Sequence, residues 1–204
     1  MGLVALVCAL GVYINAQAVV QDVPAVQKTW FEIGYKYDAA DKPEHITALR
    51  AKLPGTPSPA LLKELDRWAK GEVQKDKVRP LLVAHAKTIG GWEAVQAFRL
   101  GEWCSQLEDT VLEFMVGAML DRPEVWASAL FRMPALTAQA QGFIDTLSTT
   151  VPEIVIRSLE SIVQASQKID VLGVYFNRVS MDDLIKAVLS IPDNVSTLKR
   201  AYGG

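Results

Sequence analysis

The side chains best suited to proton transfer or metal binding are few, because this chain of 204 residues contains only two histidines, His45 and His85. A di-iron site in a helical bundle needs Glu-x-x-His on two helices together with further carboxylates. Neither histidine follows a glutamate at that spacing, and the chain contains neither Cys-x-x-Cys nor His-Glu-x-x-His. The sequence therefore predicts no metal and no haem cofactor, and each histidine is interpreted as a surface or partly buried residue.

Two features resemble nucleophile sites, and neither supports catalysis. The run Ser-Thr-Leu-Lys at 196–199 has the spacing of serine acyl-transfer enzymes, but the companion motifs are absent and the run lies near a C-terminus that we expect to fray. Cys104 shares a helical face with Leu100 and Leu107, which predicts a buried thiol that packs as a small apolar side chain. Cys8 lies in an apolar N-terminal segment, so the two cysteines do not indicate an oxidising compartment.

Three acidic residues lie on one face of a predicted helix: Glu102, Asp109 and Glu113. Paired carboxylates can act in general acid–base catalysis. We interpret this face instead as an exposed polar surface, because glutamine and serine are interspersed with the acids. Gly90-Gly91 is followed by tryptophan and not by the Lys-Ser or Lys-Thr pair of a phosphate-binding loop. No catalytic or cofactor-binding residue is therefore predicted.

The tryptophans are the remaining candidates for ligand contact. Core packing is expected to account for most of them, while one or two could line a groove for an apolar ligand or a partner helix. The five are Trp30, Trp68, Trp92, Trp103 and Trp126.

Composition excludes one class of partner. Half of the residues are hydrophobic and 22% are charged, as in folded globular proteins. The 21 basic and 23 acidic residues give a formal net charge of −2. The densest basic group, between Lys70 and Arg79, is interrupted by Glu72 and Asp76. A chain without a basic patch is not expected to bind nucleic acid.

The N-terminal segment bears on location, because residues 1–21 contain no charged side chain. Ala-Gln-Ala at 16–18 fits a signal-peptidase site, which favours a signal peptide of residues 1–18, although no basic residue precedes the apolar run. Residues 1–20 also just reach the length of a membrane anchor, and a buried core helix is the third interpretation. We expect an extracytoplasmic protein, periplasmic or secreted, or a membrane-anchored one, with 19–204 as a single helical domain.

Prolines and capping residues divide the rest of the chain into helix-length pieces. Ser58 before Pro59, and Ser180 three residues before Asp183, are expected N-caps. The run 72–79 is expected to be charged and exposed, 171–176 has strand character but is interpreted as helical, and 191–193 is expected to be a turn. Helices are predicted at 24–40, 44–53, 59–71, 80–87, 92–120, 123–133, 134–147, from 152 onward, at 180–189 and in a short last segment.

The longest predicted helix, at about 92–120, is expected to be the central element of the fold. Its apolar residues form one stripe, which predicts burial against other helices. Ala97, Gly101 and Ser105 are spaced by four, so a second helix can approach closely there. The predicted fold class is all-α, an irregular multi-helix bundle with one long central helix, preceded by an apolar N-terminal segment.

These observations favour a non-enzymatic binding or scaffold protein that contacts another protein through a helix face. The first alternative is a bundle that holds an apolar ligand such as a lipid between its helices. The second is an enzyme whose site is assembled from scattered residues, which would require a histidine to meet carboxylates or Cys104 in a pocket.

Overall fold

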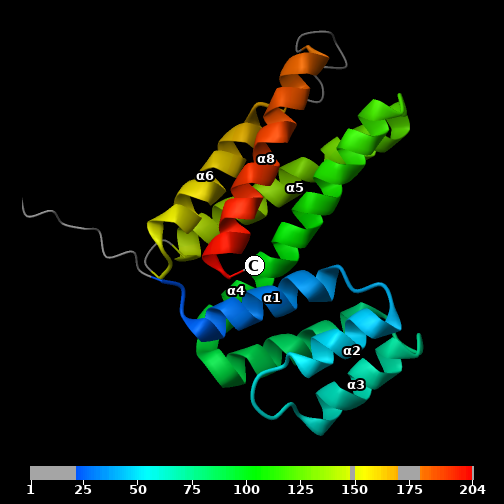
Figure 1. Cartoon of the computed structure of the whole chain (residues 1–204), viewed down its shortest axis with the longest axis vertical. Coiled ribbons are helices and arrows are strands. Elements are labelled where there is room, and N and C mark those ends of the chain that lie inside the picture. Colours follow the sequence, from blue (N-terminus) through cyan, green and yellow to red (C-terminus); the bar gives the residue numbers. More distant parts are fainter. Residues whose placement is uncertain (1–21, 148–149, 170–179, 204) are drawn as a thin grey trace, which may run out of the picture.

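The structure is a computed structural model that describes residues 22–147, 150–169 and 180–203. All regular secondary structure within these ranges is helical, so the all-α prediction is confirmed (Figure 1). The helices are α1 (Ala25–Asp38), α2 (Pro43–Ala51), α3 (Pro59–Ala69), α4 (Lys75–Met119), α5 (Pro123–Leu147), α6 (Glu153–Gln167) and α8 (Met181–Ala201).

A glycine pair divides α4 into two arms, residues 75–89 and 92–119. Gly91 has φ of 71° and ψ of −156°, a backbone conformation that side chains with a Cβ rarely adopt. The predicted end at Gly90-Gly91 and the predicted long helix from Trp92 are therefore confirmed. Because the chain changes direction at this break, both arms of α4 contact α1.

The first arm begins at Lys75, five residues before Pro80, which was predicted to lie in the first turn. The prediction that 72–79 is an exposed charged run is therefore wrong at Val78, whereas Asp76 and Lys77 are exposed. Two tertiary contacts explain the earlier start. Val78 is fully buried, and the hydroxyl of Tyr37 on α1 donates a hydrogen bond of 2.9 Å to the carbonyl oxygen of Lys75. Pro80 lies in the second turn, where its missing N–H removes a single helix hydrogen bond.

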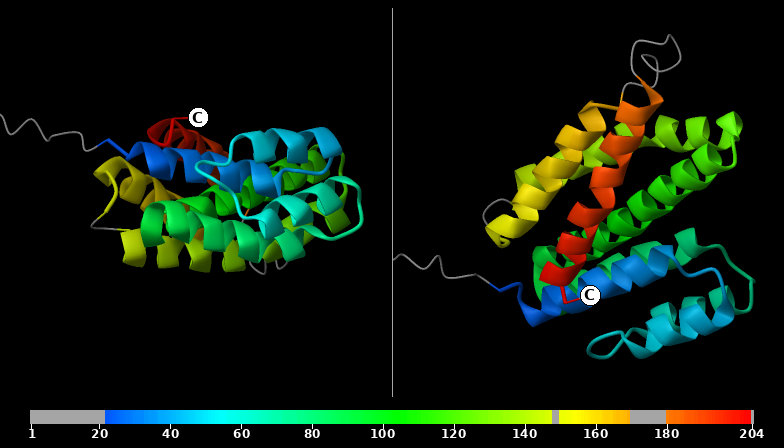
Figure 2. Two further views of the ribbon diagram at one scale, coloured as in Figure 1. Left: turned by 90° about the horizontal axis from the view of Figure 1, so that it is seen from below. Right: turned by 45° about the horizontal axis from the view of Figure 1, so that its top comes forward.

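The molecule has two parts that share α4 and meet at α1 (Figures 1 and 2). The first arm packs with α1 and α3, and α2 packs against α1 and α3. The second arm packs with α5 and α8, while α6 covers α5 and α8. At the crossing of α1 and α4, a Cβ on Gly101 would lie 2.1 Å from the carbonyl oxygen of Phe31. A Cβ on Gly34 would lie 1.9 Å from the carbonyl oxygen of Phe98. The close approach predicted at Gly101 is thus confirmed, and its partner is α1.

Two prolines lie within continuous helices: Pro134, where a helix start or a kink was predicted, and Pro192, where a turn was predicted. Helix α5 continues through Pro134, and α8 continues through Pro192, so the predicted turn at 191–193 is wrong. Ile191 and Val195 are both fully buried, and their burial holds α8 helical on either side of the proline. Both predicted caps form, because the hydroxyl oxygens of Ser58 and Ser180 accept hydrogen bonds from the third residue after each.

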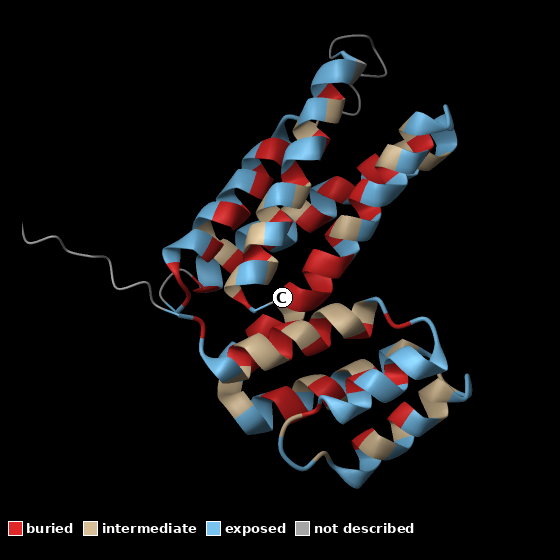
Figure 3. Ribbon diagram, in the orientation of Figure 1, coloured by how far each residue is buried: buried red, intermediate tan, exposed pale blue. Residues whose placement is uncertain are grey.

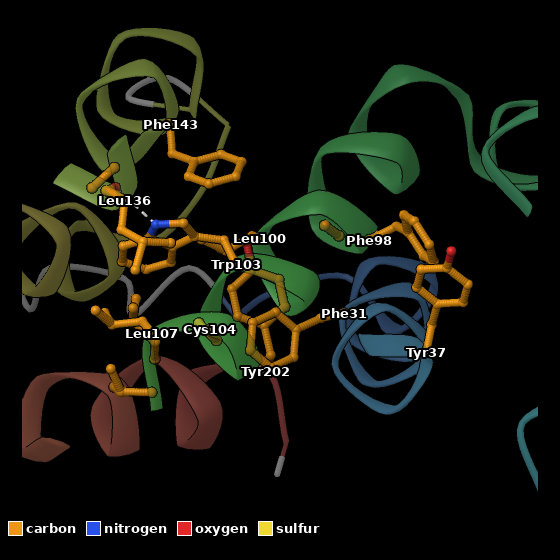
Figure 4. Close-up of a cluster of buried hydrophobic side chains, with 14 of the residues drawn as sticks. Phe31, Tyr37, Phe98, Leu100, Trp103, Cys104, Leu107, Leu136, Phe143 and Tyr202 are labelled. Carbon is orange, nitrogen blue, oxygen red and sulfur yellow. Dashed lines mark hydrogen bonds between the residues drawn. The ribbon is translucent and has the colours of Figure 1, made fainter. Parts of the chain in front are cut away.

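One continuous core connects the two parts, and its residues follow the inward faces of the helices (Figure 3). Trp103 lies at its centre, with its indole N–H donating to the carbonyl oxygen of Leu136 at 2.9 Å (Figure 4). The ring of Tyr202 stacks on Phe31, with centroids 4.5 Å apart. The expected fraying of the C-terminus is therefore wrong as far as Tyr202, because this stack fastens the end of α8 to α1.

The predictions for residues 1–21 and 171–176 fall outside the described residues. Among the helices that the structure describes, none combines the length and the apolar character needed to cross a bilayer.

Candidate functional site

Both histidines have local structural partners. His85 is nearly buried, its Nε2 donates to the carbonyl oxygen of Pro54 at 2.9 Å, and its ring meets the edge of Trp30. His45 is exposed, with Nδ1 2.9 Å from a carboxylate oxygen of Asp41. Over the described ranges, no three His, Cys, Asp or Glu side chains come together as metal ligands would. The surface has a cleft between α4 and α5 and a groove between α4 and α8, and neither histidine lines either of them.

The two resemblances to nucleophile sites do not form reactive arrangements. Cys104 is completely buried, and this burial, together with the charge of Glu108, raises the pKa of its thiol far above the ordinary value. Ser196 is exposed on α8, whereas Nζ of Lys199 lies 3.2 Å from both the hydroxyl of Tyr35 and Oε1 of Glu108. The lysine therefore joins α8 to α1 and α4, and its hydrogen bonds are made away from the serine.

The three carboxylates predicted to share an exposed face separate in the structure. Asp109 and Glu113 are exposed, and Glu113 pairs with Arg132 of α5. Glu102 is only 5% exposed, so the prediction of an exposed face is wrong at this position. The guanidinium of Arg79 donates two hydrogen bonds of 2.8 Å to its carboxylate, one to each oxygen. The first arm of α4 thus covers an acid on the second arm.

Burial raises the pKa of the Glu102 carboxyl above its ordinary value, even though Arg79 favours the charged form. The hydrogen bonds to Glu102 in turn raise the pKa of the Arg79 guanidinium. Two parallel hydrogen bonds hold the Arg79 and Glu102 side chains in one relative orientation, in addition to the attraction between their charges. It forms one wall of the cleft between α4 and α5.

This cleft has a volume of about 510 Å³. That size falls within the range of small-molecule sites, which is about 300–1,000 Å³. Its floor is aromatic, because Phe143 meets the edge of Trp103 with centroids 5.9 Å apart (Figure 4). Its walls carry mainly hydrogen-bonding side chains. The polar lining residues are Arg79, Gln96, Arg99, Glu102, Gln106, Gln139 and Thr146.

Arg99 is the exceptional residue of the cleft. Its Nε is buried without a hydrogen-bond partner, and no carboxylate among the described residues pairs with its guanidinium. The guanidinium instead lies over the ring of Trp92, with Cζ 5.3 Å from the ring centroid. An unsatisfied buried donor costs about 1–3 kcal/mol, so this side chain has hydrogen-bonding capacity that the fold itself does not use.

A second, apolar groove lies between the second arm of α4 and α8, which diverge away from their contact near α1 (Figures 1 and 2). Its volume is about 240 Å³, and Glu108, paired with Lys199, lies at one end. The remaining lining residues are apolar: Val111, Leu112 and Met115 from α4, and Ile191, Pro192 and Val195 from α8.

Exposed apolar side chains extend the α4 wall of this groove. Leu112 is 61% exposed, Val116 43% and Met119 79%. Their spacing of four and three residues places them on one helix face. On α8, Ile185 and Leu189 precede the lining residue Pro192 at the same spacing. The groove is therefore the start of a longer apolar surface with two helical walls.

Trp103 lines the polar cleft, and Trp92 lies beside it against Arg99, while none of the five tryptophans lines the apolar groove. Sequence reasoning missed Arg79 and Arg99, because the Arg79–Glu102 pair depends on the fold-back at Gly90-Gly91. The apolar surface had a readable signal: the last turns of α4 carry apolar residues on their outward face as well as toward the core.

No protein-family model matches the chain, and neither a curated protein nor a solved structure matches it.

Proposed function

We propose that this chain is a non-enzymatic helical binding protein whose groove between α4 and α8 receives an apolar face of a helix from another protein. The observation that supports it is the exposed stripe Leu112, Val116 and Met119, which continues the apolar lining of the groove. Exposed apolar surface arranged in this way commonly marks an interaction site.

The dimensions favour a helix over an enclosed lipid. At about 240 Å³ the groove is smaller than the roughly 300–1,000 Å³ of sites that engulf small apolar molecules. A helix can lie along two diverging walls and bury both rows of side chains with anchors at helical spacing. The two rows are Leu112–Val116–Met119 on α4 and Ile185–Leu189–Pro192 on α8.

The charges at the closed end of the groove suit the same occupant. Lys199 neutralises Glu108 there, with nitrogen–oxygen distances of 3.2 and 3.3 Å, so the apolar walls end at a pair that is already balanced. A partner helix therefore needs no buried charge to dock. Burying an unpaired charge would be costly, so its polar residues are expected to remain in solvent at the rim.

Fluorescence titration with a dansyl-labelled amphipathic peptide of about 18 residues, five helical turns, tests the proposal. The double variant Leu112→Gln, Met119→Gln should bind at least about tenfold more weakly, since it removes two apolar anchors worth at least about 1.4 kcal/mol together. Both side chains are largely exposed, so the melting temperature should change little.

Phe131→Gln is the matched control, because Phe131 is 68% exposed on α5 and does not line the groove. It should bind the peptide like wild type. Equal affinity of all three proteins, or no binding by wild type, would contradict the proposal. Binding of a fluorescent fatty acid in place of the peptide, lost in the same double variant, would instead support the apolar-ligand alternative.

We also propose that the protein is exported, with cleavage after Ala18. The support is the uncharged segment 1–21 with its Ala-Gln-Ala at 16–18. Intact mass from the native host should lack residues 1–18, and Ala18→Tyr should block their removal. A full-length mass in the membrane fraction would favour the anchor of residues 1–20, and a full-length mass in the soluble fraction would refute both.

A further inference from the structure

We propose that the cleft between α4 and α5 is a binding site for a small organic acid, with the carboxylate held by Arg99 and an apolar body lying over Trp103 and Phe143. This site is distinct from the α4–α8 groove. Gln106 faces the cleft, whereas Glu108 and Val111 face the groove. The inference therefore does not depend on the proposed function.

The charges in and around the cleft assign the anion to Arg99. The guanidinium of Arg79 is already occupied by both oxygens of Glu102. Nearby, Nζ of Lys75 lies 3.2 Å from Asp38. Arg99 is the lining cation that lacks a carboxylate partner among the described residues. A guanidinium presents its donors as a planar fork that matches a carboxylate.

The same charges favour a ligand with one negative charge. Glu102 lines the cleft, and within the described ranges Arg79 is the cation that forms an ion pair with it. A second anionic group on the ligand would find no further free cation among the lining residues and would face this carboxylate. A monocarboxylate satisfies Arg99 and leaves the existing pair intact.

The rest of the cleft suits an uncharged body. The aromatic floor offers an apolar surface, and the side chains of Gln96 and Gln139 can donate or accept hydrogen bonds at the walls. Gly142 lies at the α5 side, and a Cβ built on it meets nothing within 4 Å. This empty space above Gly142 is part of the volume that the body would fill.

Isothermal titration calorimetry with 3-phenylpropionate and its neutral amide, 3-phenylpropionamide, tests the site. Wild type should bind the acid at least about tenfold more tightly than the amide, because a charge-assisted pair with Arg99 is lost in the amide. Arg99→Gln should weaken binding of the acid by a similar factor and should leave binding of the amide nearly unchanged.

Gly142→Leu fills the cleft from a position where added atoms meet no neighbour, so it should abolish binding of both compounds without lowering the melting temperature. Gly142→Ala is its matched control and should retain binding. The proposal is overturned if wild type does not bind the acid, if it binds acid and amide equally, or if inorganic phosphate binds as tightly as the acid. Unchanged binding in Gly142→Leu would place the ligand elsewhere and overturn it as well.

Discussion

The burial and the charge partners of individual side chains in this protein depend on which helix packs over them. Glu102 belongs by spacing to a polar helix face, yet the first arm of α4 covers it and provides Arg79 as its partner. Replacing such a pair by apolar residues is often neutral or stabilising. We therefore expect the pair to contribute more to the orientation of the cleft wall than to stability.

The raised pKa of Glu102 predicts how the free energy of unfolding depends on pH. Because burial raises its pKa, the folded protein keeps a proton on this carboxyl at pH values where the unfolded chain has lost it. Its contribution to the free energy of unfolding therefore decreases as pH rises above the ordinary value of 4.5. In urea titrations from about pH 4 to about pH 7, Glu102→Gln should gain stability relative to wild type.

Gln139→Ala is the control, because it changes an uncharged residue that lines the same cleft. Its stability should run parallel to that of wild type across this pH range. A Glu102→Gln curve that is also parallel to wild type, or that falls relative to it, would contradict the raised pKa.

Glycines determine how closely α1 and α4 pack, because they carry no side chain at the crossing of the two helices. Gly34 and Gly101 let the backbones of α1 and α4 come into direct contact, and this contact sets the angle at which the second arm of α4 leaves the crossing. The position of α4 in turn decides how far it diverges from α8. The apolar groove thus depends on two glycines that do not line it.

A single methyl group tests this crossing. In Gly101→Ala the new Cβ would lie 2.1 Å from the Phe31 carbonyl oxygen and 2.7 Å from the Tyr35 nitrogen, so helices must separate. The free energy of unfolding in urea should fall by about 3 kcal/mol, the upper range for overpacking. Gly142→Ala, in an open helical position, should instead gain about 0.5–1 kcal/mol. Equal stability of the two variants would show that the crossing is not tightly constrained.

At the scale of the whole molecule, the first and last described helices close the fold on each other. Tyr202 is buried against Phe31, and Lys199 hydrogen-bonds both Tyr35 of α1 and Glu108 of α4. These contacts connect the part built on the first arm to the part built on the second. We therefore expect the two parts to unfold together.

Tyr202→Ala removes the aromatic side of this connection. The free energy of unfolding should fall by about 3–5 kcal/mol, as for other buried aromatic truncations. Tyr202→Phe keeps the stacked ring and should stay within about 1 kcal/mol of wild type. Circular dichroism and tryptophan fluorescence during urea unfolding provide the measurement. A Tyr202→Ala protein as stable as Tyr202→Phe would mean that the end of α8 is not part of the cooperative core.

Local signals in the sequence determined where most helices lie. Ser58 and Ser180 cap the helices that follow them, and Gly90-Gly91 interrupts α4, because hydrogen bonds to the first turn and positive φ angles depend on residues next to each other in the chain. The small residue Gly101 also indicated a close helix contact. It did not identify the partner, since α1 and α4 are far apart in sequence.

Only the tertiary structure decided the features that form the two clefts. The start of α4 at Lys75 depends on Tyr37, and the continuity of α8 through Pro192 depends on burial of its neighbours. Three features depend on which helix covers which side of α4: the partner of Glu102, the lack of a carboxylate partner for Arg99 among the described residues, and the exposure of Leu112 within the same ranges. Helix periodicity defines the faces of a helix, but the free energy that selects a neighbour for each face comes from contacts between distant segments.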